Sequence, residues 1–412
     1  MAPPKLGVDQ QQIYSALTDA VGSSISLKYP KSGKYLSAFI VEDIDGDGGS
    51  EAVVFYEKTS LAVEENTLRI NVLDQENGSW RSVCDTPADG AEIEKVMISQ
   101  LGSNDRINLI IGTSLVNRSE KNVSIYNYSG GAIEKSFSSA CSFIDVTDLD
   151  RDGMNEFLLL AGASSDHSAM VDSYKLDDEG IYHRYSCDLS GSFTEFDSLQ
   201  YGQIDEKYTA LYIDAHSGTG LIQTDIVYLD SGGMNKVFKT AEESLATVRP
   251  SGCKSYDIDK DGALEIPVQK IASGYEQSPE SEQMKITHWL AVDSEGKSRA
   301  EYRSYYSINY GYVFIFPERW HGNVTVKTDA INDEIVFCAL DGENRAGREL
   351  LRIYCAEDSA SREDRISSGY MVMHTKGETA YLACIPQTDE NSDDDKLSLS
   401  AGETAVNFRL VN

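Results

Sequence analysis

Apolar residues alternate with polar ones through most of the chain, in short runs separated by Gly-containing turns. A period of two predicts half-buried strands, and two such runs joined by a tight turn predict a β-hairpin. A 3.6-residue spacing predicts one clear helix over residues 8–21, with Ile13, Leu17 and Val21 on one face and Asp9 as its cap. Hairpins are predicted over residues 68–83, 123–137, 170–185, 225–239 and 288–302.

Continuously apolar segments recur ahead of these hairpins, and each is expected to be a strand covered on both faces. They are "AVVFY" (52–56), "LIIG" (109–112), "FLLLA" (157–161) and "ALYI" (210–213). One such strand, an outer hairpin and a connection make about four strands in a repeat of about 50–57 residues, which is typical of a β-propeller blade. The sequence therefore predicts a mainly β fold, a β-propeller with five recognisable repeats.

The pattern also predicts domain boundaries. Residues 1–22 are expected to be an N-terminal linker and short helix, and residues 23–303 the propeller. After 303 the repeat is lost and aromatic residues become dense, as in "YYSINYGYVFIFPERW". Residues 304–412 are therefore expected to form a small antiparallel-sheet domain, β or α+β in class.

An acidic loop precedes three of the repeats. Residues 43–51, 148–156 and 257–265 all fit D-x-D-x-D-G-x-x-E. Carboxylates at loop positions 1, 3, 5 and 9, the carbonyl at 7 and a turn-forming Gly at 6 provide oxygen ligands only, which suits calcium. The predicted ligands of about three structural calcium sites are Asp43, Asp45, Asp47, Gly49, Glu51, Asp148, Asp150, Asp152, Met154, Glu156, Asp257, Asp259, Asp261, Ala263 and Glu265.

Two alternatives bear on these loops. An acidic loop can also be a solvated turn that caps a strand. A degenerate copy of the motif, called the worn loop below, lies at 100–108 and has Gln100, Gly102 and Asn104 at the acidic positions, so it is expected to bind no metal. A still more degenerate copy lies at 198–214. Where metal binds, a role in stability is expected rather than in chemistry.

The composition of the chain excludes some classes of binding partner. Asp and Glu number 67 against 36 Lys and Arg, a net charge of −31, which disfavours nucleic acid and anionic lipid. No apolar run reaches the roughly 18–20 residues of a membrane span. Seven Cys show no C-x-x-C spacing, which argues against a zinc cluster.

Catalytic motifs are missing from the sequence: G-x-S-x-G, the P-loop and G-x-G-x-x-G do not occur. His216, next to Ser217 and two residues from Asp214, is expected to be a surface residue, and Trp80, Tyr182, Trp289 and Trp320 are expected to pack between sheets. No catalytic or organic-cofactor residue is assigned, although a carboxylate pair of the glycosidase type could exist among so many acids.

The motifs resemble a known family. "DIDGDGGSEAVVF" and "DLDRDGMNEFLLLAG" look like the FG-GAP/VCBS repeats of integrin-α-like propellers, which hold calcium in such loops. Residues 24–303 resemble uncharacterised lipoproteins of Gram-positive gut Firmicutes, and "GYVFIFPERW" is similar to the opening of Mog1/PsbP-like α+β modules. The resemblance implies an extracellular, cell-surface protein with a lipid anchor upstream, although no signal peptide or lipobox is seen in the sequence.

Two functions remain open. The favoured hypothesis is a non-catalytic extracellular binding or scaffold protein, monomeric, with a calcium-stabilised propeller and an unknown protein or glycan as ligand. The alternative is an extracellular hydrolase or lyase that acts on a polysaccharide or cell-wall substrate at the propeller axis.

Overall fold

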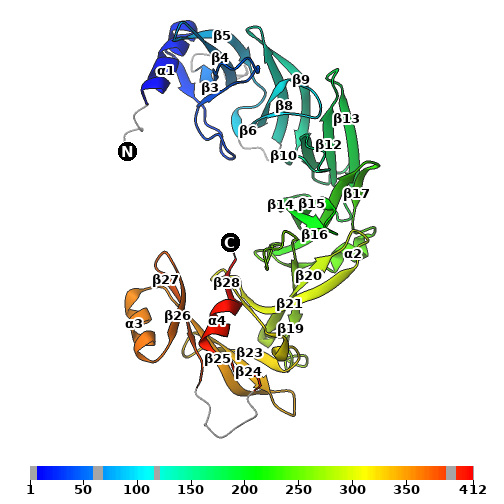
Figure 1. Cartoon of the computed structure of the whole chain (residues 1–412), viewed down its shortest axis with the longest axis vertical. Coiled ribbons are helices and arrows are strands. Elements are labelled where there is room, and N and C mark those ends of the chain that lie inside the picture. The colour runs from blue at the N-terminus through cyan, green and yellow to red at the C-terminus, as the bar shows by residue number, and fades with distance from the viewer. Residues whose placement is uncertain (1–6, 59–67, 116–120, 387–395, 412) are drawn as a thin grey trace. The chain divides into compact units, whose positions relative to one another are not determined.

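The computed structural model describes residues 7–58, 68–115, 121–386 and 396–411. Within these ranges the chain is mainly β and forms six antiparallel sheets, labelled by their strands in Figure 1. The chain divides into two compact units. One comprises residues 1–196, 207–211 and 225–236, and the other comprises residues 197–206, 212–224 and 237–412.

Helix α1 (Val8–Val21) has the bounds that the sequence predicts. Its buried residues Ile13 and Leu17 pack against sheet 1. The predicted cap is wrong, because Gly7 is the N-cap residue. Asp9 lies in the first turn, where its negative charge interacts favourably with the helix dipole. No helix within the described ranges is long and apolar enough to cross a membrane.

Three sheets belong to the first unit. Sheet 1 contains β1 (Ile25–Leu27), β2 (Phe39–Glu42), β3 (Glu51–Lys58), β4 (Leu68–Glu76) and β5 (Ser79–Pro87). Sheet 2 contains β6 (Glu92–Gln100), β7 (Ile107–Ser114), β8 (Lys121–Ser129) and β9 (Ala132–Cys141). Sheet 3 contains β10 (Phe143–Thr147), β11 (Glu156–Ala161), β12 (Met170–Leu176) and β13 (Tyr182–Asp188).

The apolar strands predicted from the sequence are buried because neighbouring sheets share cores. In β7, Leu109 and Ile111 join a core with strands of sheet 1, whereas Ile110 joins a core with Phe157 of sheet 3. Alternate residues of a strand point to opposite faces, so one strand contributes to two cores. Within this unit, consecutive sheets therefore pack face to face.

Sheet 4 begins with a tight hairpin where the sequence suggested a degenerate acidic loop. Asp205 and Glu206, in the three-residue turn between β14 and β15, have φ angles of 54° and 55°, which lie in the left-handed region. Sheet 4 contains β14 (Phe196–Ile204), β15 (Tyr208–His216), β16 (Leu221–Asp230), β17 (Gly233–Lys236) and β18 (Arg249–Pro250), and α2 (Ala241–Leu245) precedes β18.

Two sheets lie in the second unit. Sheet 5 contains β19 (Ile266–Ile271), β20 (Lys285–Val292), β21 (Ser298–Ser307), β22 (Tyr312–Ile315) and β28 (Phe408–Leu410), with η1 (Glu280–Glu282) between β19 and β20. Sheet 6 contains β23 (Val324–Asp329), β24 (Glu334–Leu340), β25 (Ala346–Ala356), β26 (Met371–Lys376) and β27 (Thr379–Cys384). The remaining helices are η2 (Glu318–Trp320), α3 (Ser359–Ser367) and α4 (Ala401–Asn407).

The five predicted hairpins are confirmed as β4–β5, β8–β9, β12–β13, β16–β17 and β20–β21. The expected boundary after residue 303 falls inside β21, which continues to Ser307 and pairs with β22. The C-terminal β28 then pairs with β22, so sheet 5 contains strands from both sides of that boundary.

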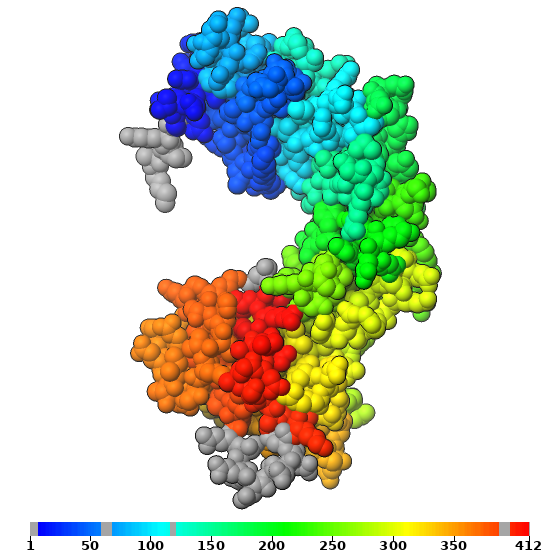
Figure 2. All heavy atoms as spheres, in the orientation of Figure 1, coloured from blue at the N-terminus to red at the C-terminus, as the bar shows by residue number. Residues whose placement is uncertain are grey.

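Aromatic residues after position 303 fill a core between sheets 5 and 6. Phe314 and Trp320 contact Phe337 with ring centroids 5.1 and 5.7 Å apart, and the Trp320 indole N–H donates to the carbonyl of Leu397 at 2.7 Å. Figure 2 shows the C-terminal segment (red) beside both the yellow and the orange parts of this unit; its strand β28 belongs to sheet 5, and Phe408 joins the same core. Trp320 thus packs between sheets as expected, whereas Trp289, also fully buried, packs in a cluster with Val313 and Ile315 of its own sheet.

A buried ion pair joins β15 to β18 in the part of sheet 4 that belongs to the second unit. Arg249 and Asp214 are 1% exposed, and Nη2 of Arg249 lies 2.8 Å from Oδ1 of Asp214. Arg249 also donates to Thr224, and the Ser255 amide donates to Asp214. Burial alone would raise the pKa of Asp214, but the charge of Arg249 and these hydrogen bonds hold it below its ordinary value.

Replacement of Arg249 should make the folded protein less stable. We expect Arg249→Met to lower the free energy of unfolding by about 3–5 kcal/mol, because it leaves a buried carboxylate without a counter-charge. Arg345, whose pair with Glu343 is exposed, is the matched control, and Arg345→Ala should change stability by less than about 1 kcal/mol. Denaturant unfolding measures both, and equal losses in the two variants would contradict the prediction.

Candidate metal sites

Three acidic loops occupy equivalent places, each directly before a strand whose first residues are buried. Residues 43–51 join β2 to β3, residues 148–156 join β10 to β11, and residues 257–265 end one residue before β19. The Gly at loop position 6 has a φ angle of 88°, 89° and 95° in chain order, which explains why that position is glycine. These loops are called loop 1, loop 2 and loop 3.

The three loops share one hydrogen-bond pattern. The carboxylate at position 1 accepts from the Gly amide at position 6 at 3.0 Å in each loop. The carboxylate at position 5 accepts from the amide at position 7 at 2.7, 2.9 and 2.8 Å. The sequence motif therefore encodes one backbone conformation, formed three times.

The glutamate at position 9, which closes each loop, is buried. Glu51 is 2% exposed, and Glu156 and Glu265 are 0% exposed. In each, Oε2 accepts the amide at position 2, at 2.9, 2.7 and 3.0 Å. In Glu156 and Glu265 the other oxygen, Oε1, is buried and receives no hydrogen bond from the described residues.

Burial raises the pKa of all three closing glutamates. The pKa rises to about 7 in Glu156 and to about 8 in Glu265, where the neighbouring charges of Asp259 and Asp261 add to the effect of burial. A buried carboxylate that stays ionised needs a positive partner. The closing glutamates are therefore the groups that a bound cation would relieve most.

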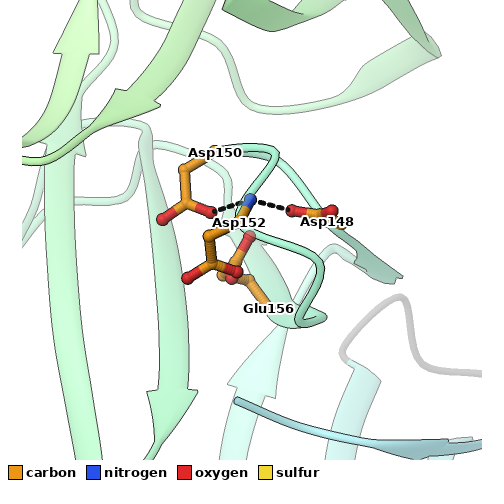
Figure 3. A group of neighbouring side chains, drawn as sticks. All are labelled: Asp148, Asp150, Asp152 and Glu156. Atoms are coloured by element: carbon orange, nitrogen blue, oxygen red, sulfur yellow. Dashed lines mark hydrogen bonds between the residues drawn. The ribbon is translucent and has the colours of Figure 1, made fainter. Parts of the chain in front are cut away.

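The carboxylates of each loop converge so that one oxygen from each lies within 4.8 Å of the others. The groups are Asp43, Asp45 and Glu51; Asp148, Asp150, Asp152 and Glu156, drawn together in Figure 3; and Asp257, Asp259 and Glu265. Each group could hold a metal ion through oxygen ligands. Asp47 and Asp261 lie outside their groups, and the carbonyls of Gly49, Met154 and Ala263 stay predicted ligands.

Loop 2 contains a side chain that the sequence did not bring to attention. The Lys175 Nζ lies 3.0 Å from Oδ2 of Asp150 and 3.1 Å from Oε1 of Glu156, and it also contacts Oδ2 of Asp152. The contact with Glu156 is an ion pair rather than a directed hydrogen bond. Burial alone would lower the pKa of Lys175, but the three carboxylates outweigh burial and raise it.

The worn loop at 100–108 is filled by amide side chains. Gln100 donates to the carbonyl of Asp105 at 3.0 Å, and Asn104 accepts from the amide of Arg106 at 2.9 Å. Position 9 is Asn108, which is fully buried and donates to the carbonyls of Ser99 and Arg106.

His216 has no catalytic arrangement with its neighbours. Asp214 is engaged by Arg249, and the hydroxyl of Ser217 donates to Gln223 at 2.9 Å. The His216 Nε2 lies 3.9 Å from Oδ1 of Asp197. These contacts do not form a Ser–His–Asp chain.

No protein-family model matches the chain, and no curated protein matches it. Among solved structures it is similar to the exotype rhamnogalacturonan lyase YesX, with a TM-score of 0.27 and 12% identity over 75% of this chain and 60% of that one. It is also similar to the rhamnogalacturonan lyase PL11 of Bacillus licheniformis, with a TM-score of 0.26 and 12% identity over 76% of this chain and 61% of that one. The chain thus spans about three fifths of the length of these structures. At these TM-scores neither similarity assigns a residue or a function to it.

The missing partner of Glu265 gives a prediction for metal-free protein. In chelator, Glu265→Gln should be at least as stable as the unchanged protein, because a neutral amide avoids both the burial of a charge that no cation balances and the proton uptake that would neutralise it. Glu334 is the control: it is 1% exposed but paired with Arg352 and Arg365, so Glu334→Gln should lose about 2 kcal/mol or more. Thermal and denaturant unfolding in chelator measure both changes. A marked loss of stability in Glu265→Gln would show that its charge is already compensated.

Proposed function

We propose that this protein is a non-catalytic binding or scaffold module of the cell surface, built as a β-propeller of FG-GAP/VCBS-type repeats and stabilised by calcium. The observation that carries the proposal is the closing glutamate: it recurs in three loops and is buried in each. In loop 3 it lies in one group with Asp257 and Asp259, and its buried Oε1 receives no hydrogen bond from the described residues. The antiparallel sheets of four or five strands that follow one another along the described parts of the chain support the propeller.

Calcium is proposed because of the ligand chemistry. The three groups contain carboxylates and no His or Cys among the described residues, which favours a hard cation. The ligands come from a short loop and from the end of a strand, and their side chains differ in length. Calcium tolerates the irregular coordination geometry that results, with six to eight oxygen ligands. Magnesium requires a near-ideal octahedron and gives up its water reluctantly, so it fits these loops less well.

A structural role follows from where the loops lie. Each loop closes on the first residues of a strand that packs into a shared core, as Glu51 begins β3 and Glu156 begins β11. A cation bound there would fix the strand end and remove the repulsion between the carboxylates. A ligand sphere already filled by side chains and a carbonyl leaves little room for a substrate.

An extracellular location fits the proposed affinity for calcium and the resemblance to lipoproteins of Gram-positive bacteria. Extracellular calcium modules bind with dissociation constants of about 10⁻⁴–10⁻³ M, which suits short acidic loops on a protein of this charge. We propose a protein or glycan as the partner and a lipid anchor as the means of attachment to the cell surface.

Calcium should raise the melting temperature, and magnesium should do so much less. At several-fold excess over the dissociation constant, each site adds about 1 kcal/mol, which corresponds to a shift of several degrees for more than one site. Thermal melts in EDTA, calcium and magnesium measure this.

The same samples should show no turnover of polysaccharide or ester substrates, because the loops serve stability. A screen of plant and bacterial cell-wall glycans, with and without calcium, tests this expectation. Calcium-dependent turnover together with a melting temperature indifferent to calcium would overturn the proposal in favour of an extracellular hydrolase or lyase.

A further inference from the structure

Loop 2 already has a cation within it. Lys175 is 17% exposed, and its ammonium contacts Asp150, Asp152 and Glu156, three of the four carboxylates that would bind a metal. In loop 2 the carboxylate at position 5 joins the converging group, whereas Asp47 and Asp261 do not join theirs. The four carboxylates therefore converge in the loop that has a positive charge at its centre.

The register of the sheets explains how Lys175 reaches this place. Phe157 of β11 pairs with Tyr174 of β12, so Glu156 and Lys175 are the next residues across the same two strands. The residue across from position 9 is here called the opposing residue. In sheet 1, Ala52 pairs with Leu73, so the opposing residue of Glu51 in loop 1 is Asp74. In sheet 5, Ile266 pairs with Leu290, so the opposing residue of Glu265 in loop 3 is Ala291.

Sheet 2, where the acidic loop is worn, follows the same rule with neutral groups. Asn108 at position 9 pairs with Asn127, its opposing residue. The Asn127 side-chain amide donates to Oδ1 of Asn108 at 3.1 Å. A neutral closing residue thus has a neutral partner, and no cation is required there.

Loop 3 has a small opposing residue with a cavity beside it. Ala291 has a one-carbon side chain and lines a cavity of about 820 Å³ together with Asp261 and Ala263. Two cations also line this cavity, but Lys297 is paired with Glu295 and Arg299 with Glu301. Oε1 of Glu265 is buried and receives no hydrogen bond from the described residues. In loop 1 the opposing residue is Asp74, which adds a fifth carboxylate to the four of the motif.

We infer that the opposing residue decides which acidic loops bind calcium: Lys175 replaces the metal in loop 2, and calcium binds in loops 1 and 3. This inference rests on the calcium binding proposed above and changes the expected occupancy from three loops to two. To bind in loop 2, calcium would have to displace an ammonium group from three carboxylates. In loops 1 and 3 no such displacement is needed, and Asp74 adds negative charge beside loop 1.

The experiment counts bound calcium by isothermal titration of chelator-treated protein and compares three variants. We expect about two sites in the unchanged protein, about three in Lys175→Met and about one in Ala291→Lys. Lys28 is the matched control, because it is 18% exposed and paired with Glu57 and Glu92 at 2.9 Å but is remote from the loops. Lys28→Met should leave the number of sites unchanged.

Melting temperatures in EDTA provide a readout that needs no metal. Ala291→Lys should melt about 2–4 °C above the unchanged protein, because the new ammonium offsets the carboxylates of loop 3. Lys175→Met should melt lower in EDTA and recover with calcium. If Lys175→Met does not fold without calcium, Ala291→Lys still tests the inference.

The outcomes separate the two proposals. Three sites in the unchanged protein, or no additional site in Lys175→Met while loops 1 and 3 bind, would overturn the inference and leave the proposed calcium binding intact. An additional site in Lys28→Met would overturn it as well, because the effect would then be one of general charge. No calcium bound by any variant, with Ala291→Lys still stabilised in EDTA, would overturn the proposed calcium binding and retain Lys175 as the internal cation of loop 2.

Discussion

The structure depends on how negative charge is neutralised where a buried strand begins. The strand after each acidic loop begins with buried residues, so its start is withdrawn from water together with the loop end. An ionised glutamate in that position is costly unless a cation lies close to it. Glu156 has the ammonium of Lys175, whereas Glu265 has no positive partner among the described residues. Asn108 in sheet 2 avoids the problem by being neutral.

The loops are also tied to the hydrophobic cores, which links charge neutralisation to packing. Position 2 of each loop is apolar and at most 1% exposed: Ile44, Leu149 and Ile258, and likewise Leu101 in the worn copy. The amide of this buried residue donates to the closing glutamate in the three acidic loops. A displaced glutamate would therefore disturb a residue of the core, so cation binding can stabilise a whole sheet rather than a surface turn.

Local patterns predicted much of this arrangement. The alternation of apolar and polar residues predicted the five hairpins, and continuous apolar runs predicted the strands with two buried faces. The acidic motif predicted three equivalent loops, which share one conformation. Contacts between distant segments could not be predicted in the same way. The pairing of β28 with β22 joins Leu410 to Tyr312 across about a hundred residues, and no local period encodes it. Lys175 was missed because it lies outside the loop motif and meets Glu156 only through the register of β11 and β12.

The two ways of neutralising a loop differ in their dependence on the surroundings. A lysine is present whenever the chain is folded, whereas a metal stabilises the fold in proportion to its free concentration. On this assignment sheets 2 and 3 keep their loop ends closed without metal, and sheets 1 and 5 depend on calcium. Sheet 1 shares a core with sheet 2, in which Ile44 of loop 1 packs with Leu109 of β7. Loss of calcium from loop 1 would therefore loosen sheet 1 first and reach sheet 2 only through that shared core, while the lysine-closed loop of sheet 3 would remain formed.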